Sequence, residues 1–351
     1  MPEYTHGGDT LTAQTAYGGA VLDFSANLNP LGMPPQAAEA AAEAARNASA
    51  YPDPLCRALR AAIAAHDGVG AEQVICGNGA ADLIFRLAFA LKPRRALVTA
   101  PTFSEYAAAL GCAGCEVASH LLRPEDSFDL GEDFLQCIDG TVDLVLLCTP
   151  NNPTGRLIHS GLLEGAAARC QECGARLVVD ECFLPLSDGA GPGLVPLLSK
   201  YPNLFLLRAF TKSYAMAGLR LGYGLSADLA LLETLYRFAQ PWSVSTPAQA
   251  AGVAALGCPQ WPEEARALVA RERPRLAAGL EALGLTVTPG QANYLLFRAP
   301  GRADLREAVL TKGILIRSCA NYRGLDSDYY RVCVRTGEEN GRLLSALREV
   351  L

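Results

Sequence analysis

The sequence has few charged and aromatic residues and lacks any long uninterrupted apolar run. Charged side chains make up 19% and aromatic side chains 7% of the 351 residues, while 50% are apolar. No stretch approaches the 18 consecutive apolar residues of a membrane-spanning helix, so no span is predicted. No Lys/Arg-rich run occurs and the formal net charge is −6, which argues against nucleic acid or an anionic membrane as partner. We therefore expect a soluble globular protein.

A secretion signal is also lacking, since the first residues, MPEYTHGGDT, contain no basic segment followed by an apolar stretch. The twelve cysteines are therefore interpreted as buried free thiols rather than as disulfides, which predicts a cytoplasmic protein. Two pairs with CxxC spacing, Cys112/Cys115 and Cys170/Cys173, raise the alternative of a zinc site. The second pair falls in a helical pattern and neither has flanking turn residues, so core packing is favoured and no metal is predicted.

Apolar strand-like runs alternate with amphipathic helical runs through the middle of the chain. Strands are predicted at 95–100, 143–148, 176–180 and 204–208, and helices at 104–111, 160–173 and 190–200. This alternation predicts an α/β fold with a mostly parallel central sheet covered by helices on both faces. Functional side chains should then gather at the carboxyl ends of the strands.

The pattern changes near residue 240 to a helical region, interrupted at 257–262, followed by strand-like segments and a C-terminal helix. This change predicts a smaller α+β domain after the α/β domain. We expect three parts: an N-terminal arm and substrate-pocket loop (1–31), a large cofactor-binding domain (32–240) and a small C-terminal domain (241–351).

One lysine stands among apolar and small residues. The stretch LLRAFTKSYAMAGLRLGYG (206–224) places Lys212 at the carboxyl end of a predicted strand. A solvated surface charge is the ordinary interpretation of a lysine. The flanks instead predict that Lys212 points into the molecule, where desolvation lowers its proton affinity and makes the amine a nucleophile suited to Schiff-base chemistry.

Neighbouring strand ends offer complementary groups. The segment VICGNGAAD (74–82) is typical of a strand, a Gly-rich turn and a helix start that binds phosphate, although such turns are also common structural punctuation. The segment CTPNNPTG (148–155) either projects the amide of Asn152 or is an ordinary Asn-Pro turn. Asp180 ends an apolar strand and is either a helix N-cap or a buried carboxylate that needs a partner. Phe103, in PTFSEY, adds an aromatic ring.

An amine, a carboxylate, an amide, an aromatic ring and a phosphate-binding turn together fit pyridoxal 5′-phosphate (PLP). Lys212 would form the Schiff base, and Asp180 would keep the pyridine nitrogen protonated so that the ring accepts electrons. Asn152 would donate a hydrogen bond to the ring hydroxyl oxygen, and Phe103 would stack on the ring. The sequence thus predicts a PLP-dependent enzyme with Lys212 and Asp180 as catalytic residues.

The order of the motifs GNGAAD, PTFSEY, TPNNPTG, VDECF and FTKSYAMAGLRLGYG resembles the fold-type I, class I/II PLP-dependent aminotransferases, in particular their histidinol-phosphate aminotransferase branch. The resemblance runs the whole chain. Within that branch, the segments THGGD, DFSANLNPLGMP, YPDP, PWSVS, QANYLLFR and ILIRSCANYRGLDSDYYRVCVR are most similar to members that decarboxylate L-threonine O-3-phosphate. The resemblance implies this reaction, which yields (R)-1-aminopropan-2-ol O-phosphate for cobalamin biosynthesis. Amino transfer to or from histidinol phosphate or a similar amino phosphate is the alternative.

The resemblance also implies roles for further residues. Arg220 would bind the cofactor phosphate together with backbone groups at Gly79 and Ala80. Tyr51 would reach the same phosphate from a neighbouring subunit, which implies a homodimer. The resemblance assigns the substrate pocket to four side chains, with the two guanidinium groups binding carboxylate and phosphate: His6, Asn27, Arg317 and Arg331.

Two positions depart from the family pattern. Ala209 stands where relatives usually carry a Ser or Thr that donates its hydroxyl to the cofactor phosphate. Phe183 stands where the aminotransferases have a tyrosine contacting the ring oxygen, which agrees better with the decarboxylase reaction. Arg323 and Arg335 are interpreted as ordinary surface ion pairs.

Overall fold

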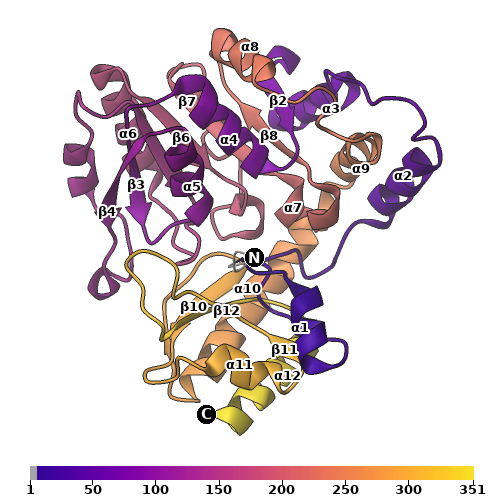
Figure 1. Ribbon diagram of the computed structural model, residues 1–351, viewed down its shortest axis with the longest axis vertical. Helices are drawn as coiled ribbons and strands as arrows, with labels where there is room; N and C mark the ends of the chain where they lie inside the picture. The colour runs from indigo at the N-terminus through magenta and orange to yellow at the C-terminus, as the bar shows by residue number, and fades with distance from the viewer. Residues whose placement is uncertain (1–5) are drawn as a thin grey trace.

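The computed structural model describes residues 6–351, so Thr5 of the THGGD motif lies outside the described residues. Figure 1 shows two lobes. The larger lobe contains a seven-stranded sheet in the order β2-β8-β7-β6-β5-β3-β4, in which only β8 runs antiparallel to its neighbours. Its strands are β2 (Val74–Gly77), β3 (Arg95–Ala100), β4 (Glu116–Leu121), β5 (Leu144–Cys148), β6 (Arg176–Asp180), β7 (Leu204–Ala209) and β8 (Gly222–Leu225). The predicted mostly parallel α/β sheet is confirmed.

The central strands are buried on both faces, which explains their near-continuous apolar sequences. Successive residues of β5 enter two different apolar clusters: Val145 and Leu147 join one, and Leu144 and Leu146 join the other. This follows from the alternation of side chains along a strand. The two clusters are the cores between the sheet and its two helical layers.

Seven helices of eight or more residues belong to the part of the chain around this sheet: α2 (Pro35–Arg46), α3 (Arg57–Asp67), α4 (Ala80–Leu91), α5 (Ser104–Cys112), α6 (Ser160–Cys173), α8 (Leu229–Arg237) and α9 (Thr246–Leu256). The helices predicted at 104–111 and 160–173 are confirmed. The helix predicted at 190–200 is wrong, because only a 3-10 turn, Val195–Leu197, forms there. Gly191 and Gly193 weaken helix formation, and Pro192 and Pro196 lack the N–H group that a helix interior requires.

The smaller lobe contains a four-stranded antiparallel sheet in the order β12-β13-β10-β9 and a parallel pair, β1-β11. Its strands are β1 (Leu22–Asp23), β9 (Thr286–Val287), β10 (Tyr294–Arg298), β11 (Ile314–Leu315), β12 (Arg317–Ser318) and β13 (Tyr329–Cys333). Its helices are α1 (Thr10–Tyr17), α10 (Gln260–Glu281), α11 (Leu305–Leu310) and α12 (Gly337–Val350). Helix α10 starts earlier than predicted because Pro262 falls in its first turn, where no N–H is needed.

Some contacts cross the predicted domain boundaries, which themselves stay a prediction. Strand β1, from the predicted arm, pairs with β11 of the smaller lobe. Helix α9, which follows residue 241, packs on α2 and α3, and Figure 1 shows these three helices together at one side of the larger lobe. The arm is therefore joined to the smaller lobe, and α9 to the larger one.

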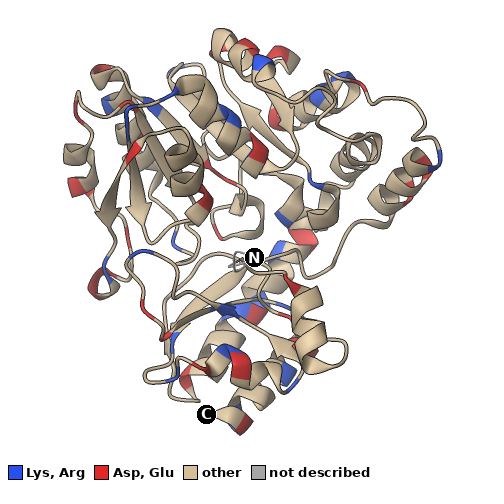
Figure 2. Ribbon diagram, in the orientation of Figure 1, with Lys and Arg blue, Asp and Glu red and all other residues tan. Residues whose placement is uncertain are grey.

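Figure 2 shows acidic and basic positions spread over both lobes. All twelve cysteines are unpaired, as predicted, but only nine are buried, because Cys112 and Cys137 are exposed and Cys173 is partly exposed. Across residues 6–351, no three or more His, Cys, Asp or Glu side chains are grouped so as to hold a metal ion. Among the helices described, none is both long and apolar enough to cross a membrane.

Candidate active site

The carboxyl ends of β5, β6 and β7 meet the start of α4 around one cavity. Six of the residues predicted from the sequence line it: Ala80, Phe103, Asn152, Asp180, Lys212 and Arg220. The two departures from the family pattern, Phe183 and Ala209, line it as well. Parallel strands bring their carboxyl ends to the same edge of a sheet, which explains why residues so distant in sequence gather here.

Lys212 lies in the single helical turn α7 (Phe210–Ser213), directly after β7. The pKa of Lys212 is lowered to about 8, mainly by burial and also by the positive charges of Arg331 and Arg220, against the opposing effects of Cys182 and Asp180. The Lys212 Nζ atom lies 5.3 Å from the centroid of the Phe183 ring. The environment thus shifts the amine toward its neutral form compared with an exposed lysine, as the sequence predicted.

Asp180 ends β6 and is 5% exposed. Its Oδ2 accepts a hydrogen bond of 2.7 Å from the Tyr106 hydroxyl, and its Oδ1 accepts one of 2.9 Å from the backbone N–H of Cys182. The helix N-cap interpretation is wrong, because the next helical turn begins at Leu184 and is preceded by Phe183. Within residues 6–351 the carboxylate has no cationic partner in ion-pair contact, so its buried charge can be balanced by a protonated ligand group.

Tyr106 was not predicted as a site residue. Its ring is fully buried and packs edge-to-face on Phe103, with 5.5 Å between the ring centroids. Burial and the neighbouring Asp180 charge raise the pKa of the Tyr106 hydroxyl, which therefore remains a hydrogen-bond donor. The spacing of three residues between Phe103 and Tyr106 at a helix start could have indicated a shared face.

The start of α4 forms a compact cradle with Arg220. The N-cap Gly79 has φ +83°, and no side chain caps the helix. A Cβ on Gly79 would lie 2.6 Å from the Arg220 Nη2 atom, so the guanidinium group rests directly on this turn. Uncapped N–H groups of a 12-residue helix, its dipole and a guanidinium group together favour a phosphate.

Asn152 connects the cavity to the smaller lobe. Its Oδ1 accepts a hydrogen bond from the Arg331 guanidinium group and lies 3.5 Å from the Tyr322 hydroxyl. These contacts use the amide oxygen and leave Nδ2 available as a donor, and Asn152 lines the cavity. The predicted bond from this amide to a ligand oxygen is compatible with these contacts.

Arg317 and Arg331 are both buried. Arg331 Nη2 also donates to the backbone oxygen of Ser25, at 2.7 Å, and Arg317 Nη2 donates to Asn321 Oδ1, also at 2.7 Å. The Tyr322 ring stacks under Arg317, 5.5 Å from its Cζ atom. Neither guanidinium group contacts a carboxylate of residues 6–351, and burial lowers the pKa of Arg317. Uncompensated buried cations of this kind favour a bound anion.

Three further predicted residues, His6, Asn27 and Tyr51, are not among the residues that line this cavity. His6 Nε2 is 2.9 Å from Glu105 Oε1, and its ring is 6.3 Å from the Phe103 ring, which places it beside the site. Asn27 is almost fully buried, and neither its Oδ1 nor its Nδ2 has a hydrogen-bond partner. Tyr51 is 77% exposed and stacks on Trp242, so it is not part of the cavity of its own chain.

These features fit PLP. A desolvated lysine, a buried carboxylate without a cation, an uncapped helix start under Arg220 and the orphaned amide of Asn27 are the groups that the cofactor and its substrate would satisfy. Lys212, Asp180, Asn152, Phe103 and Arg220 would hold the cofactor.

The chain belongs to the aminotransferase class I and II family, whose profile matches residues 20–347. The fold-type I architecture predicted from the sequence is thereby confirmed. The chain is 42% identical to threonine-phosphate decarboxylase of Salmonella typhimurium, over 99% of this chain and 96% of that protein.

Two solved structures share the fold over nearly the whole chain. Histidinol-phosphate aminotransferase from Clostridium acetobutylicum aligns with a TM-score of 0.87 and 28% identity, covering 94% of this chain and 99% of the other. L-threonine-O-3-phosphate decarboxylase from Porphyromonas gingivalis aligns with a TM-score of 0.82 and 25% identity, covering 93% and 98%. The resemblance predicted from the motifs is confirmed by these similarities.

Proposed function

We propose that this protein is a PLP-dependent decarboxylase that converts L-threonine O-3-phosphate to (R)-1-aminopropan-2-ol O-phosphate, a step of cobalamin biosynthesis. The observation that carries the proposal is the pair of buried guanidinium groups, Arg317 and Arg331, of which Arg331 lies near enough to Lys212 to lower its pKa. A small substrate with a carboxylate and a phosphate would satisfy both. The 42% identity to a threonine-phosphate decarboxylase supports the choice of this substrate.

Bound at this site, PLP supplies a ring that accepts the electron pair of whichever substrate Cα bond stands perpendicular to the ring plane. The protein's part is to select that bond. Arg317 and Arg331 would hold the two anionic groups at fixed positions, which prevents rotation about the substrate N–Cα bond and keeps the Cα–carboxylate bond perpendicular. Asp180 would hold the proton on the pyridine nitrogen.

After carbon dioxide leaves, Cα needs a proton. Lys212 Nζ is suited to deliver it, because a pKa of about 8 allows the amine to carry and release a proton near neutral pH. Tyr106 and the Cys182 N–H hold the Asp180 carboxylate in place, which would fix its position relative to the pyridine nitrogen.

We propose further that two copies of the chain form the working enzyme. Tyr51 and Trp242 form an exposed stacked pair with a ring-centroid distance of 4.3 Å. Large exposed aromatic groups are typical of interaction surfaces. In a twofold dimer, Tyr51 of one subunit would reach the cofactor phosphate of the other. The twelve unpaired cysteines support a reducing compartment, and we propose the cytoplasm.

The decisive experiment offers the purified protein two substrates. With L-threonine O-3-phosphate alone, we expect release of carbon dioxide and formation of the amino alcohol phosphate. With histidinol phosphate and 2-oxoglutarate, we expect no glutamate. Rapid glutamate formation without decarboxylation would overturn the proposal in favour of an aminotransferase.

A further inference from the structure

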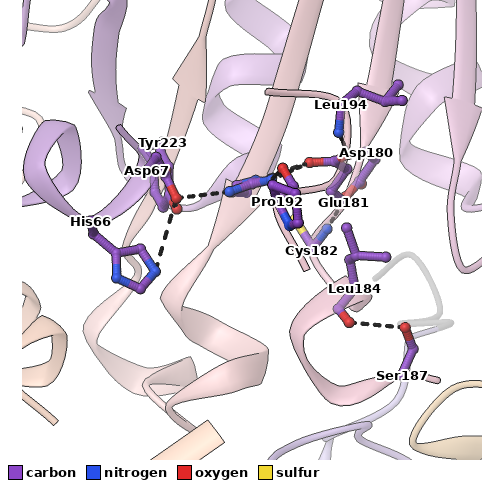
Figure 3. A network of polar contacts seen from close by, with 11 residues as sticks. His66, Asp67, Asp180, Glu181, Cys182, Leu184, Ser187, Pro192, Leu194 and Tyr223 are labelled. Carbon is purple, nitrogen blue, oxygen red and sulfur yellow. Dashed lines mark hydrogen bonds and ion pairs between the residues drawn. The ribbon is translucent and has the colours of Figure 1, made fainter. Parts of the chain in front are cut away.

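A buried charge network lies at the end of β6 and β7, on the face of the sheet opposite Asp180. Figure 3 shows Asp67, Tyr223 and His66 at one side of it and Glu181, Pro192 and Leu194 at the other. Arg208 joins the two sides. Its Nη1 lies 2.8 Å from Asp67 Oδ1, and its Nε and Nη2 lie 2.9 and 2.7 Å from Glu181 Oε2.

The network is almost completely removed from solvent. The side chains of Glu181, Asp67 and Arg208 are 1%, 3% and 11% exposed. Burial would lower the pKa of Arg208, but the charges of Glu181 and Asp67 together raise it, so the guanidinium group remains charged. Separating one side chain from the other two would leave an unpaired buried charge. Because this is costly, the three side chains are held rigidly together.

Additional hydrogen bonds attach the network to four parts of the chain. Tyr223, which is paired in register with Arg208 across β7 and β8, donates to Asp67 at 2.9 Å, and Asp67 ends α3. The N–H of Leu194 donates to Glu181 Oε1 at 2.8 Å, and Arg208 Nη2 donates to the oxygen of Pro192. The network thus fixes β7, β8, α3 and the loop after β6 relative to one another.

Each end of the Arg208–Glu181 pair is close in sequence to a group of the proposed site. Glu181 directly follows Asp180, and alternation along the strand sends the two carboxylates to opposite faces. Arg208 is followed by Ala209 and then by the turn that carries Lys212. In addition, Glu181 N–H donates to the backbone oxygen of Leu207 at 2.8 Å, which ties the two strand ends together.

We propose that Arg208 is a positioning residue. Its ion pairs with Glu181 and Asp67 set the spacing of the ends of β6 and β7, and this spacing determines where Asp180 and Lys212 lie on the other face of the sheet. Arg208 touches neither cofactor nor substrate. The inference rests on the proposed role of Lys212 as the amine that carries PLP.

The test compares Arg208→Lys, Arg208→Met and Glu181→Gln, with Arg176→Met as matched control. Arg176 starts β6 and makes a similar ion pair, with Nη2 2.7 Å from Asp228 Oδ2, but it lies at the opposite end of the strand. The full chain, freed of cofactor, is treated with an acylating reagent at a series of pH values, and the labelling of Lys212 is followed by peptide mass spectrometry. Decarboxylation by the PLP-loaded protein is measured in parallel.

If Arg208 acts by position, all three variants loosen the site, admit water and raise the pKa of Lys212. A rise of one unit would reduce labelling at pH 8 about fivefold, because the neutral fraction falls. We expect kcat to fall roughly ten- to a hundredfold with little change in KM, since the substrate anchors are elsewhere. Arg176→Met should reduce thermal stability without changing the labelling of Lys212 or kcat.

A direct effect of charge gives a different pattern. Removing a positive charge raises and removing a negative charge lowers the pKa of a nearby amine, so Arg208→Met and Glu181→Gln would then shift Lys212 in opposite directions, while Arg208→Lys would leave it unchanged. Either that pattern, or unchanged labelling in all three variants, overturns the inference. If Arg208→Met does not fold, Arg208→Lys and Glu181→Gln still distinguish an effect of position from a direct effect of charge. Attachment of PLP elsewhere than Lys212 in the unmodified protein would instead contradict the proposed function.

Discussion

Arg317 and Arg331 are directly paired across the antiparallel strands β12 and β13, although their side chains are only 8% and 5% exposed. Residues paired in this way project to the same face of the sheet. Two like charges are thereby brought together in a dry environment, with amide and backbone oxygens but, among residues 6–351, no carboxylate as partners. Such an arrangement is costly unless an anionic ligand completes it.

Replacing either arginine by lysine should therefore weaken substrate binding although the net charge is unchanged. Lysine retains the point charge but loses the two-pronged hydrogen bonding of the guanidinium group. We expect KM for L-threonine O-3-phosphate to rise roughly tenfold or more, since one charge-assisted hydrogen bond is worth about 1.5–3 kcal/mol. Arg335→Lys is the control, because Arg335 pairs with Glu339 instead.

The same arginine variants should also lose reaction specificity. A substrate held at one anion only can rotate about its N–Cα bond, and the Cα–H bond then becomes the one that breaks, which leads to slow transamination. The measurement is the loss of the visible cofactor absorption band during turnover. Unaltered KM together with an unaltered product ratio in both variants would show that these arginines do not orient the substrate.

Asp180→Ala should abolish most catalysis while the protein still folds. The variant removes the carboxylate expected to hold the protonated ring nitrogen, and a loss of several kcal/mol in transition-state stabilisation corresponds to a roughly hundredfold or larger fall in kcat. Circular dichroism checks the fold. Tyr106→Phe, which removes only the hydrogen bond to Asp180 Oδ2, should give a smaller loss in the same direction. Near-normal turnover of a folded Asp180→Ala protein would contradict the assigned role.

The sequence predicted the central strands of the large sheet, and the placement of Asp180, Asn152 and Lys212, because these follow from local rules. Buried parallel strands have continuous apolar sequences, and Asp180, Asn152 and Lys212 stand directly at or after such strands. The substrate arginines could be assigned only through family resemblance. Their pairing depends on the register of β12 and β13, which no local pattern specifies.

Other features depend on contacts that sequence spacing does not reveal. Tyr106 is an ordinary helix residue until the end of β6 brings Asp180 to its hydroxyl. Arg208 lies in an apolar strand and could equally have been a surface charge, because its partners Asp67 and Glu181 are far apart in sequence. Long-range ion pairs of this kind become visible only when the tertiary structure is known.

Gly79→Ala should impair cofactor binding. The backbone at Gly79 has φ +83°, which is unfavourable for alanine, and the added Cβ would lie 2.6 Å from Arg220 Nη2. Displacement of Arg220 from the start of α4 should raise the dissociation constant of PLP about tenfold or more, because one charge-assisted contact to the phosphate is lost. Equilibrium dialysis measures this constant. Gly140→Ala, where no atom lies within 4 Å of the added Cβ, is the control and should bind PLP normally.

The contribution of Tyr51 across a dimer can be tested by mixing two inactive variants. In a hybrid of Tyr51→Ala and Lys212→Ala subunits, one site combines the intact Lys212 of one chain with the intact Tyr51 of the other. If Tyr51 acts across the interface, refolding an equal mixture should restore about a quarter of the wild-type activity, because half of the dimers are hybrids with one good site each. Absence of recovery in dimers shown to be mixed would place Tyr51 in its own subunit's site or outside the site.

Lys212→Met should stabilise the cofactor-free protein in a pH-dependent way. Burial lowers the pKa of Lys212 from 10.5 to about 8, so the folded state binds its proton more weakly than the unfolded state. This weaker binding lowers the free energy of unfolding. The loss is fully present below pH 8, where Lys212 is protonated in both the folded and the unfolded state, and it disappears as the pH rises from 8 to 10.5. A difference of 2.5 pKa units corresponds to at most about 3.5 kcal/mol, and replacing the lysine by methionine should add part of this to the free energy of unfolding at pH 7. Denaturant unfolding at pH 7, 9 and 10.5 measures this gain in stability.

Lys200→Met is the control, because Lys200 is a surface residue paired with Glu164. It should show no gain in stability that fades over this pH range, because the pKa of Lys200 is raised rather than lowered. A constant difference between Lys212→Met and the unmodified protein at all three pH values would mean that Lys212 is not desolvated, and the explanation of its reactivity would then be wrong.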